Sequence, residues 1–276
     1  DRGVGLNGGR MGAAEAPQRF REYFSRLPAP ADWQMGSVLS AGDLMPAEHT
    51  AETHARLAEV VVVLRERFPQ ARLVVVGGGH DHAYGEVLGL ARWLAAGDAG
   101  ARLAVVNVDA HADVRPHEGE PHSGTPFRRL LEEPAARLAP GSLVEWGLQR
   151  SCNASSHLDY LHQLGARVVY WDEIDPNDAV SGQHLGRLLA DLAAGHGGLS
   201  LNVDLDAFAH AVAPGVSAPS PVGVPAGAVV RAAAALGRLP TATQLGLYEL
   251  NPRFDQDGQT ARLAARLAWS YLTGLL

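Results

Sequence analysis

Aspartate and histidine residues recur in this sequence at spacings that could hold metal ions. Residues 109–113 read DAHAD, and residues 204–206 read DLD. Residues two apart in an extended chain point the same way, so each run can project its polar side chains together. Carboxylates packed so closely repel one another, and a divalent cation would compensate that repulsion.

A histidine and a glutamate occupy comparable places elsewhere in the chain. His80 follows three glycines, Gly77 to Gly79, and Glu249 follows an apolar run. The candidate metal ligands are His80, Asp109, His111, Asp113, Asp204 and Asp206. Imidazole and carboxylate ligands without thiolate suit Mn, Fe or Zn, and abundant carboxylate favours Mn. Six ligands exceed the needs of one tetrahedral zinc, which indicates two metals that share carboxylates.

Each motif alone has a simpler interpretation. A histidine after a glycine-rich turn is more often a packing residue, and an aspartate at a strand end is more often a helix N-cap. Recurrence at several strand ends favours metal binding. His82 is predicted to be a supporting or lining residue. The other histidines considered fit no spacing and are predicted to be structural or exposed: His49, His54, His157, His162, His184, His196 and His210.

The elements that must position these residues alternate along the chain. Strands are predicted at residues 72–76, 102–108, 142–148, 167–171, 199–205 and 244–248. Helices are predicted at residues 83–96, 126–138, 156–164, 179–194, 226–239 and 260–272. This alternation is typical of βαβ units in an α/β protein with a mainly parallel sheet covered on both faces. Binding crevices of such sheets lie at the carboxyl ends of the strands, where the polar motifs fall.

Composition excludes several classes of protein. The chain has 276 residues, of which 46% are hydrophobic, so it is not intrinsically disordered. The net charge of −7 disfavours nucleic-acid binding. The uncharged stretch 207–230 contains four prolines, so we expect no membrane span there. The single cysteine, Cys152, cannot form an internal disulfide, which fits a reducing, cytoplasmic location. No linker is visible, and we expect one domain over residues 1–276.

Four motifs, in this order, resemble those of the ureohydrolases, the family of arginases, agmatinases and formimidoylglutamases. They are GGGH at 77–80, DAHAD at 109–113, DLD at 204–206 and ELNP at 249–252. The resemblance spans essentially the whole chain and is greatest to the formimidoylglutamase branch, through DVR at 113–115, SGTPF at 123–127 and APGVSAP at 213–219. Residues 1–14 also resemble that branch, where they follow the first strand, so we expect a truncated N-terminus.

The resemblance implies a three-layer α/β/α sandwich with a mainly parallel sheet of about eight strands. It also implies two Mn²⁺ ions per subunit and a homo-oligomer. One ion would be held by His80, Asp109, Asp113 and Asp204. The other would be held by His111, Asp109, Asp204 and Asp206, with Asp109 and Asp204 shared.

The implied reaction is hydrolysis of the C–N bond of a linear amidine by a hydroxide bridging the two metals. N-formimino-L-glutamate would give L-glutamate and formamide. Asp113 would carry the proton to the leaving amine, and Glu249 would orient the amidinium. Two substrate carboxylates call for arginine forks, and Arg115 is the first candidate. Further candidate substrate-binding residues are Arg150, Asn153 and, less favourably placed, Arg10.

Two other functions stay open at this point. One is an agmatinase or another guanidino-acid hydrolase that releases urea. The other is a metal-binding homologue without catalysis, although none of the six ligands is lost. Ser123 stands where arginases have a histidine, which weakens an arginase assignment, although the neighbouring His122 could partly substitute.

Overall fold

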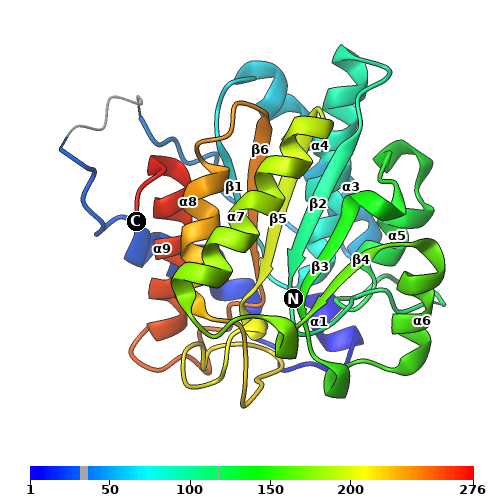
Figure 1. The fold of residues 1–276 in the computed structure, drawn as a ribbon. Coiled ribbons are helices and arrows are strands. Elements are labelled where there is room, and N and C mark those ends of the chain that lie inside the picture. Colours follow the sequence, from blue (N-terminus) through cyan, green and yellow to red (C-terminus); the bar gives the residue numbers. More distant parts are fainter. Residues whose placement is uncertain (32–36, 117) are drawn as a thin grey trace.

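Six parallel strands form one twisted sheet in the computed structural model, which describes residues 1–31, 37–116 and 118–276 (Figure 1). The strands are β1 Leu73–Val76, β2 Leu103–Val108, β3 Leu143–Leu148, β4 Arg167–Tyr170, β5 Gly198–Asp204 and β6 Ala242–Tyr248. Their spatial order is β1-β6-β5-β2-β3-β4. From β2 the chain adds β3 and then β4 on one side. It then returns to the other side of β2, where it adds β5 and, beyond it, β6. The strand order reverses between β2 and β5.

Helices cover both faces of this sheet. Their bounds are α1 Arg2–Leu6, α2 Ala16–Phe24, α3 Thr50–Arg67, α4 Ala83–Gly97, α5 Pro126–Glu132, α6 Ser155–Leu164, α7 Asp178–Gly195, α8 Ala226–Leu236 and α9 Gln259–Thr273. Helices α7, α8 and α9 lie on the near face in Figure 1, and α3, α4 and α5 lie behind it. Two hydrophobic clusters, one on each face, complete a three-layer α/β/α sandwich.

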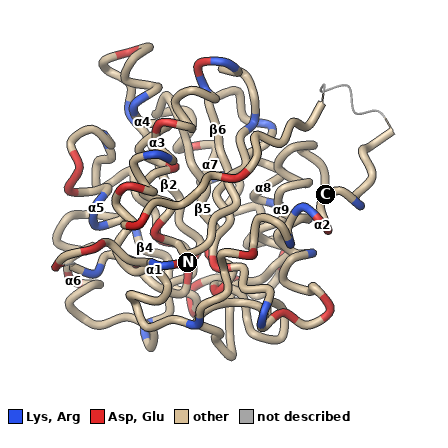
Figure 2. Tube along the Cα trace, turned by 180° about the vertical axis from the view of Figure 1, so that it is seen from behind, with Lys and Arg blue, Asp and Glu red and all other residues tan. Residues whose placement is uncertain are grey.

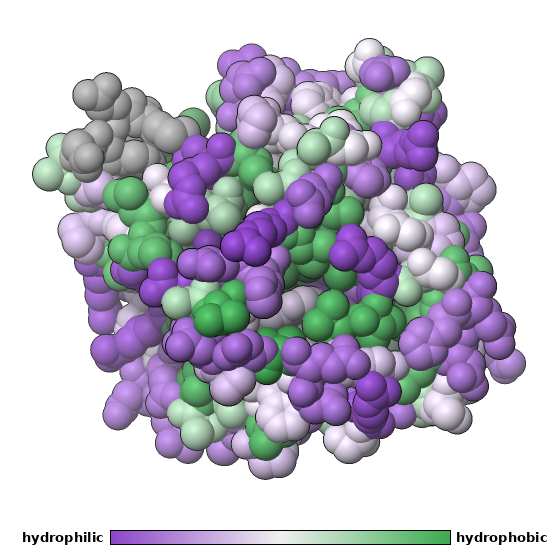
Figure 3. Space-filling view, viewed as in Figure 1, coloured by the Kyte–Doolittle hydropathy of each residue, from purple (hydrophilic) through white to green (hydrophobic). Residues whose placement is uncertain are grey.

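Alternating side chains of the central strands supply both clusters. In β2, Leu103 and Val105 pack toward α4, whereas Ala104 and Val106 pack toward α7 and α8. All six residues of this strand are buried, which is why five of the six are apolar, Asn107 being the exception. On the outer surface, Figure 3 shows mainly hydrophilic residues with apolar side chains between them. Among the described residues, we find no helix of sufficient length and apolarity to span a bilayer.

The six strands predicted from the residues are confirmed, but the expectation of about eight strands is wrong for the described chain. The described residues before β1 form helices α1, α2 and α3 and add no strand to the sheet. The helix predicted over residues 126–138 ends at Glu132, because Pro134 disfavours a helical backbone at the residue before it. The helix predicted over residues 226–239 ends at Leu236, before Gly237.

Candidate metal centre

The reversal of strand order brings two acidic loops side by side. Asp109 follows the last residue of β2, and Asp204 is the last residue of the neighbouring strand β5. His80 opens the 3₁₀ turn η2 (His80–His82) after β1, and Glu249 directly follows β6. Such a reversal leaves a crevice at the carboxyl ends of the strands. Figure 2 shows acidic positions beside the N-terminal end of the chain, which lies at this edge.

The first ligand group surrounds His80. The Nδ1 atom of His80 lies 3.0 Å from Asp109 Oδ2 and 3.1 Å from Asp113 Oδ2. It also lies 3.1 Å from Asp204 Oδ2. All four side chains are buried, and one donor atom of each lies within 4.8 Å of the others. This is the set that the sequence assigns to the first metal.

The second ligand group consists of Asp109, His111 and Asp206. His111 Nδ1 lies 3.2 Å from Asp206 Oδ2 and 3.5 Å from Asp109 Oδ1. Asp109 therefore turns one oxygen to each group, as expected of a shared ligand. Asp204, which was also predicted to be shared, lies with the first group alone in this geometry.

The loop after β2 is held in an unusual backbone conformation. Asp113 has φ = +47°, which places a non-glycine residue in the left-handed region. Asp109 Oδ1 accepts the backbone N–H of His111 at 2.7 Å. Asn153 accepts the N–H of Ala112 at 2.8 Å and donates to the carbonyl of Ala110 at 2.9 Å. These bonds hold the loop so that its polar side chains converge.

Asn153 was predicted to bind substrate, and the structure gives it a different position. Its amide also donates to the carbonyl of Gln149 at 2.8 Å, so both ends of the amide are occupied by backbone groups. It is not among the residues that line the cavity of about 220 Å³ onto which both ligand groups open. Asn153 instead ties the turn after β3 to the ligand loop after β2.

Burial and crowding raise the proton affinity of Asp113, Asp204 and Asp206 in the metal-free protein, whereas hydrogen bonds from His111 and His80 outweigh burial and lower the pKa of Asp109. Burial, together with the charge of Asp109, raises the pKa of Asp113 to about 6. Burial and the charge of Asp206 raise the pKa of Asp204 well above its usual value. Burial disfavours a charged imidazole, but the three carboxylates around His80 more than offset it and raise the pKa of His80. The site therefore binds positive charge strongly.

The donor set fits divalent cations. Neither ring nitrogen of His80 makes a hydrogen bond of good geometry, although three carboxylate oxygens lie within 3.1 Å of Nδ1. Asp206 Oδ1 is likewise buried without a hydrogen-bond partner among the described residues. Buried polar atoms without partners are rare in folded proteins. Here they converge on two positions surrounded by imidazole and carboxylate, the ligands that suit Mn²⁺.

Aromatic rings and a glutamate hold His80 in place. The ring of Tyr248 stacks on the imidazole with centroids 5.0 Å apart, and Phe127 meets it edge-on at 5.4 Å. Glu249 Oε1 accepts the backbone N–H of His80 at 2.9 Å. Glu249 has φ = +63°, and its other oxygen, Oε2, is buried without a hydrogen-bond partner in the described part of the chain. Burial raises the pKa of Glu249 to about 7.

A cavity of about 220 Å³ opens onto both ligand groups. Its lining includes His111, Asp113, Asp204, Asp206 and Glu249 on the sheet side. The opposite wall comes from the chain around α1 and from loops, and includes Asn7, Arg10, Arg115, Ser123, Ser217 and Ala218. The sequence did not single out Asn7 or Ser217. Asn7 lies within residues 1–14 and Ser217 within APGVSAP at 213–219, two segments that carry the family resemblance as a whole, but no spacing pattern marks either residue by itself.

Two of the three candidate arginines lie at this wall. Arg115 Nη1 donates to Asn7 Oδ1 at 2.6 Å, and the Asn7 amide donates to Ser123 Oγ at 3.0 Å. Arg10 donates to the carbonyl of Val216 at 2.6 Å, and its guanidinium lies over the Phe254 ring at 3.9 Å. Both guanidinium groups are thus held in defined orientations beside the cavity.

Arg150 does not line the cavity, so the structure gives no support to its predicted substrate contact. Its guanidinium lies 3.4 Å from the centre of the Tyr170 ring. Its nearest carboxylates are Glu173 at 3.5 Å and Asp172 at 4.0 Å. The side chain is 55% exposed. The short turn after β3 directs it along the surface toward β4.

The fold and this arrangement of ligands define the class of protein. The family model of the Arginase family matches residues 3–274, and the chain therefore belongs to that family. Within it, the chain is 37% identical to the formimidoylglutamase of Cupriavidus pinatubonensis over 99% of this chain and 84% of the relative. It is 33% identical to the formimidoylglutamase of Geobacillus thermodenitrificans over 96% and 79% of the two chains.

Solved structures give the same result. The Trypanosoma cruzi formiminoglutamase with Mn²⁺ superposes with a TM-score of 0.83 and 29% identity. The match covers 99% of this chain and 90% of that one. The arginase of Bacillus subtilis shares the fold with a TM-score of 0.79 at 23% identity, covering 95% and 93% of the two chains.

Stabilisation by added Mn²⁺ should depend on pH. Because the pKa of Asp113 is raised, this group contributes stability to the metal-free fold below the unfolded pKa near 4. That contribution is lost as pH rises through about 6. Cations need the deprotonated carboxylate. We expect Mn²⁺ to raise the melting temperature more at pH 8 than at pH 5.5, as measured by thermal unfolding with Mn²⁺ or with EDTA. Equal increases in melting temperature at both pH values would contradict the assignment of Asp113 as a metal ligand.

Proposed function

We propose that this protein hydrolyses N-formimino-L-glutamate to L-glutamate and formamide. The observation that carries the proposal is the cavity, which joins the two ligand groups and Glu249 to a wall bearing Arg10 and Arg115. An amidine at one end and two carboxylates at the other match this distribution of charge. The relatives named formimidoylglutamase, at up to 37% identity over nearly the full chain, support the same substrate.

Two Mn²⁺ ions per chain are proposed as the cofactor. His80, Asp109, Asp113 and Asp204 would hold one ion, and Asp109, His111 and Asp206 would hold the other. When bound, such a pair lowers the pKa of water and supplies a nucleophile at neutral pH. The Mn²⁺ named in the Trypanosoma cruzi structure supports this choice of metal.

The chain's own residues would orient the amidine and move the proton. The free Oε2 of Glu249 can accept hydrogen bonds from the amidinium nitrogens. Its other oxygen, Oε1, accepts the N–H of His80, which helps to hold the carboxylate at the cavity. Asp113 also lines the cavity, so its carboxylate lies where it would carry the proton to the leaving amine.

The wall opposite the sheet would select the acidic tail. The sequence contains no lysine, so every permanently charged cationic side chain of the chain is an arginine. Arg115 is oriented by Asn7 and Arg10 by the carbonyl of Val216, and each keeps further N–H donors for a carboxylate. Planar guanidinium forks bind carboxylates with two parallel hydrogen bonds. A cytoplasmic location and assembly into a homo-oligomer stay predictions.

A substrate panel tests the proposal directly. Mn²⁺-loaded protein is incubated with N-formimino-L-glutamate, arginine, agmatine and guanidinobutyrate, and formamide and urea are quantified separately. We expect formamide from the first compound and no urea from the others. Urea from agmatine or guanidinobutyrate would favour a guanidino hydrolase. Full metal content with no turnover of any compound would favour a protein that only binds metal.

Replacement of Arg115 by alanine should act on substrate binding. A hydrogen-bonded charge pair contributes roughly 1.5–3 kcal/mol, so KM for formiminoglutamate should rise about 10- to 100-fold. The metal content should stay unchanged, because Arg115 touches neither ligand group. Arg150→Ala is the matched control, and we expect wild-type kinetics from it. Unchanged kinetics in Arg115→Ala would remove this residue from the substrate site.

A further inference from the structure

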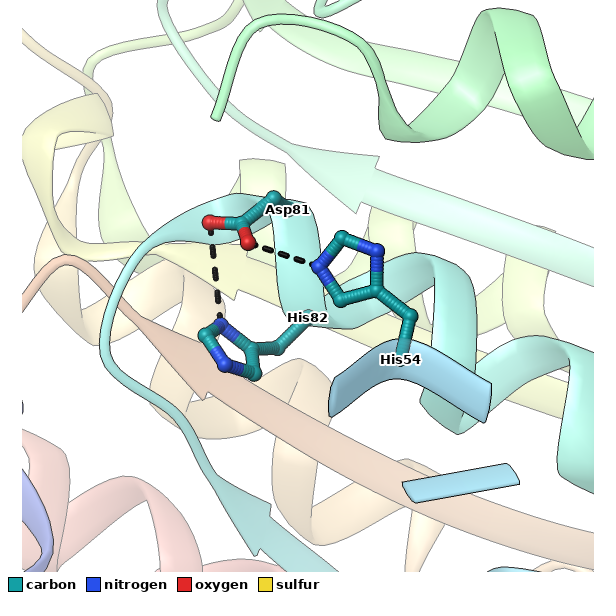
Figure 4. A group of neighbouring side chains, drawn as sticks. All are labelled: His54, Asp81 and His82. Carbon is teal, nitrogen blue, oxygen red and sulfur yellow. Dashed lines mark hydrogen bonds and ion pairs between the residues drawn. The ribbon is translucent and has the colours of Figure 1, made fainter. Parts of the chain in front are cut away.

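A buried chain of polar side chains lies behind His80 and has no part in the proposed reaction. It runs from Arg129 on α5 to His54 on α3, and then to Asp81 and His82 in the turn η2. Figure 4 shows the last three of these side chains. His54 and Asp81 are 0% exposed. Arg129 Nη1 lies 2.8 Å from His54 Nδ1, and His54 Nε2 lies 2.7 Å from Asp81 Oδ2.

The direction of the hydrogen bonds in this chain follows from the chemistry of arginine. A guanidinium only donates hydrogen bonds, so His54 Nδ1 must accept from Arg129. The ring proton of the neutral imidazole is then on Nε2, where it is donated to the Asp81 carboxylate. Burial lowers the pKa of His54, which keeps this neutral form. Arg129 therefore donates, Asp81 accepts, and His54 accepts at Nδ1 and donates at Nε2.

This cluster resembles a third metal site but does not have the chemistry of one. His54, Asp81 and His82 each offer a donor atom within 4.8 Å of the others. A histidine that binds metal normally donates its second N–H to an acceptor, whereas the second nitrogen of His54 faces the N–H donors of Arg129. His82 Nδ1 lies 2.9 Å from the carbonyl of Gly79, so this nitrogen carries the proton. Both nitrogens that face Asp81 are therefore donors rather than ligands.

We propose that Arg129, His54 and Asp81 are positioning residues that hold His80 in register with Asp113. Asp81 directly follows His80, and it has no room to shift. A Cβ built on Gly3 or Gly79 would come within 2.5 Å of its carboxylate. The other end of the chain, α5, is tied to the ligand loop, because the N–H of Phe127 donates to the carbonyl of Asp113 at 3.2 Å. The polar chain therefore connects two ligands of the first group through α3.

The proposal rests on the metal site of the proposed function, and its test measures metal binding rather than turnover. His54→Phe removes both hydrogen bonds while keeping a ring of similar shape. Loss of such a supporting residue typically lowers metal affinity about 10- to 100-fold. We expect a loss of this size for the ion in the His80 group, with the ion in the His111 group changed by less than about threefold. Mn²⁺ titration monitored by electron paramagnetic resonance distinguishes a coupled pair from a single ion.

Two variants separate positioning from general packing. His54→Gln keeps an amide that can donate to Asp81, and we expect it to recover most of the lost affinity. His162→Phe on α6 removes an exposed histidine, whose Nε2 lies 3.3 Å from the hydroxyl of Tyr170, and should leave both ions unaffected. If His54→Phe does not fold, Arg129→Met breaks the chain at its less buried end. We expect a smaller, selective loss at the His80 group from that variant.

The outcomes are distinct. Wild-type affinity for both ions in folded His54→Phe would overturn the proposal, and so would equal losses at the two ions. Three ions bound by the wild-type chain, one of which is lost in the variant, would make the cluster a metal site and also overturn it. A wild-type chain that binds no metal pair would instead overturn the proposed function.

Discussion

Asp109→Asn is expected to lower kcat by about a thousandfold or more, because this carboxylate serves both ligand groups. Its Oδ2 faces His80 and its Oδ1 faces His111. Oδ1 accepts the N–H of His111 at 2.7 Å, and Oδ2 lies 3.3 Å from the amide nitrogen of Asn107. An asparagine has only one oxygen, so its NH₂ group would meet a donor on one side or the other. Both the charge and one ligand atom would be lost.

The measurement for Asp109→Asn is kcat at saturating formiminoglutamate together with Mn²⁺ content by elemental analysis. We expect both to fall, with the protein still folded by thermal melting. Asp172→Asn removes an exposed carboxylate and should change neither quantity. Activity within tenfold of wild type would show that Asp109 does not bridge two ions.

Glu249→Gln should reduce kcat/KM by about 10²- to 10³-fold while both metal ions are retained. The variant amide oxygen can still accept the N–H of His80, which leaves the NH₂ group where Oε2 now faces the cavity. This NH₂ group would then face the N–H donors of the amidinium, and the buried charge pair between the Glu249 carboxylate and the amidinium would be lost. Breaking such a pair typically costs about 3–5 kcal/mol.

The Glu249→Gln variant is judged on kinetics and metal content together. Glu132→Gln provides a matched control, because Glu132 is an exposed residue of α5 that pairs with Arg128. Loss of metal in parallel with activity would assign Glu249 to the metal centre rather than to the substrate. An unchanged kcat/KM would exclude Glu249 from both metal binding and substrate binding.

The strands and the ligand motifs were predictable from the sequence for a physical reason. A strand buried on both faces has a largely apolar sequence, as Leu103–Val108 does apart from Asn107, and the DAHAD motif marks its carboxyl end. The helix α3 was not predicted, since its four consecutive valines, Val60 to Val63, favour strand by propensity. Tertiary packing against α4 overrides that preference.

The pairing of β2 with β5 could not be predicted either. No local pattern specifies that these two strands are neighbours, yet this pairing brings Asp109 close to Asp204. The wall of the cavity could not be predicted from the sequence either, because Asn7 contacts Arg115 and Ser123 only where irregular segments meet. His54 was predicted to be structural or exposed. It is buried beside Asp81, the residue before His82. His82 itself was predicted only to be a supporting or lining residue.

The two halves of the cavity are built by different kinds of structure. The metal ligands sit at or just after strand ends within the central sheet, whereas the opposite wall comes from residues 4–10 and from loops around residues 115, 123 and 217. None of the wall residues is a metal ligand, so we expect substitutions there to change substrate binding more than metal binding. In evolutionary terms, selection can therefore change which amidine binds without changing the metal ligands. Engineering of the substrate specificity can start from the same short stretch of chain.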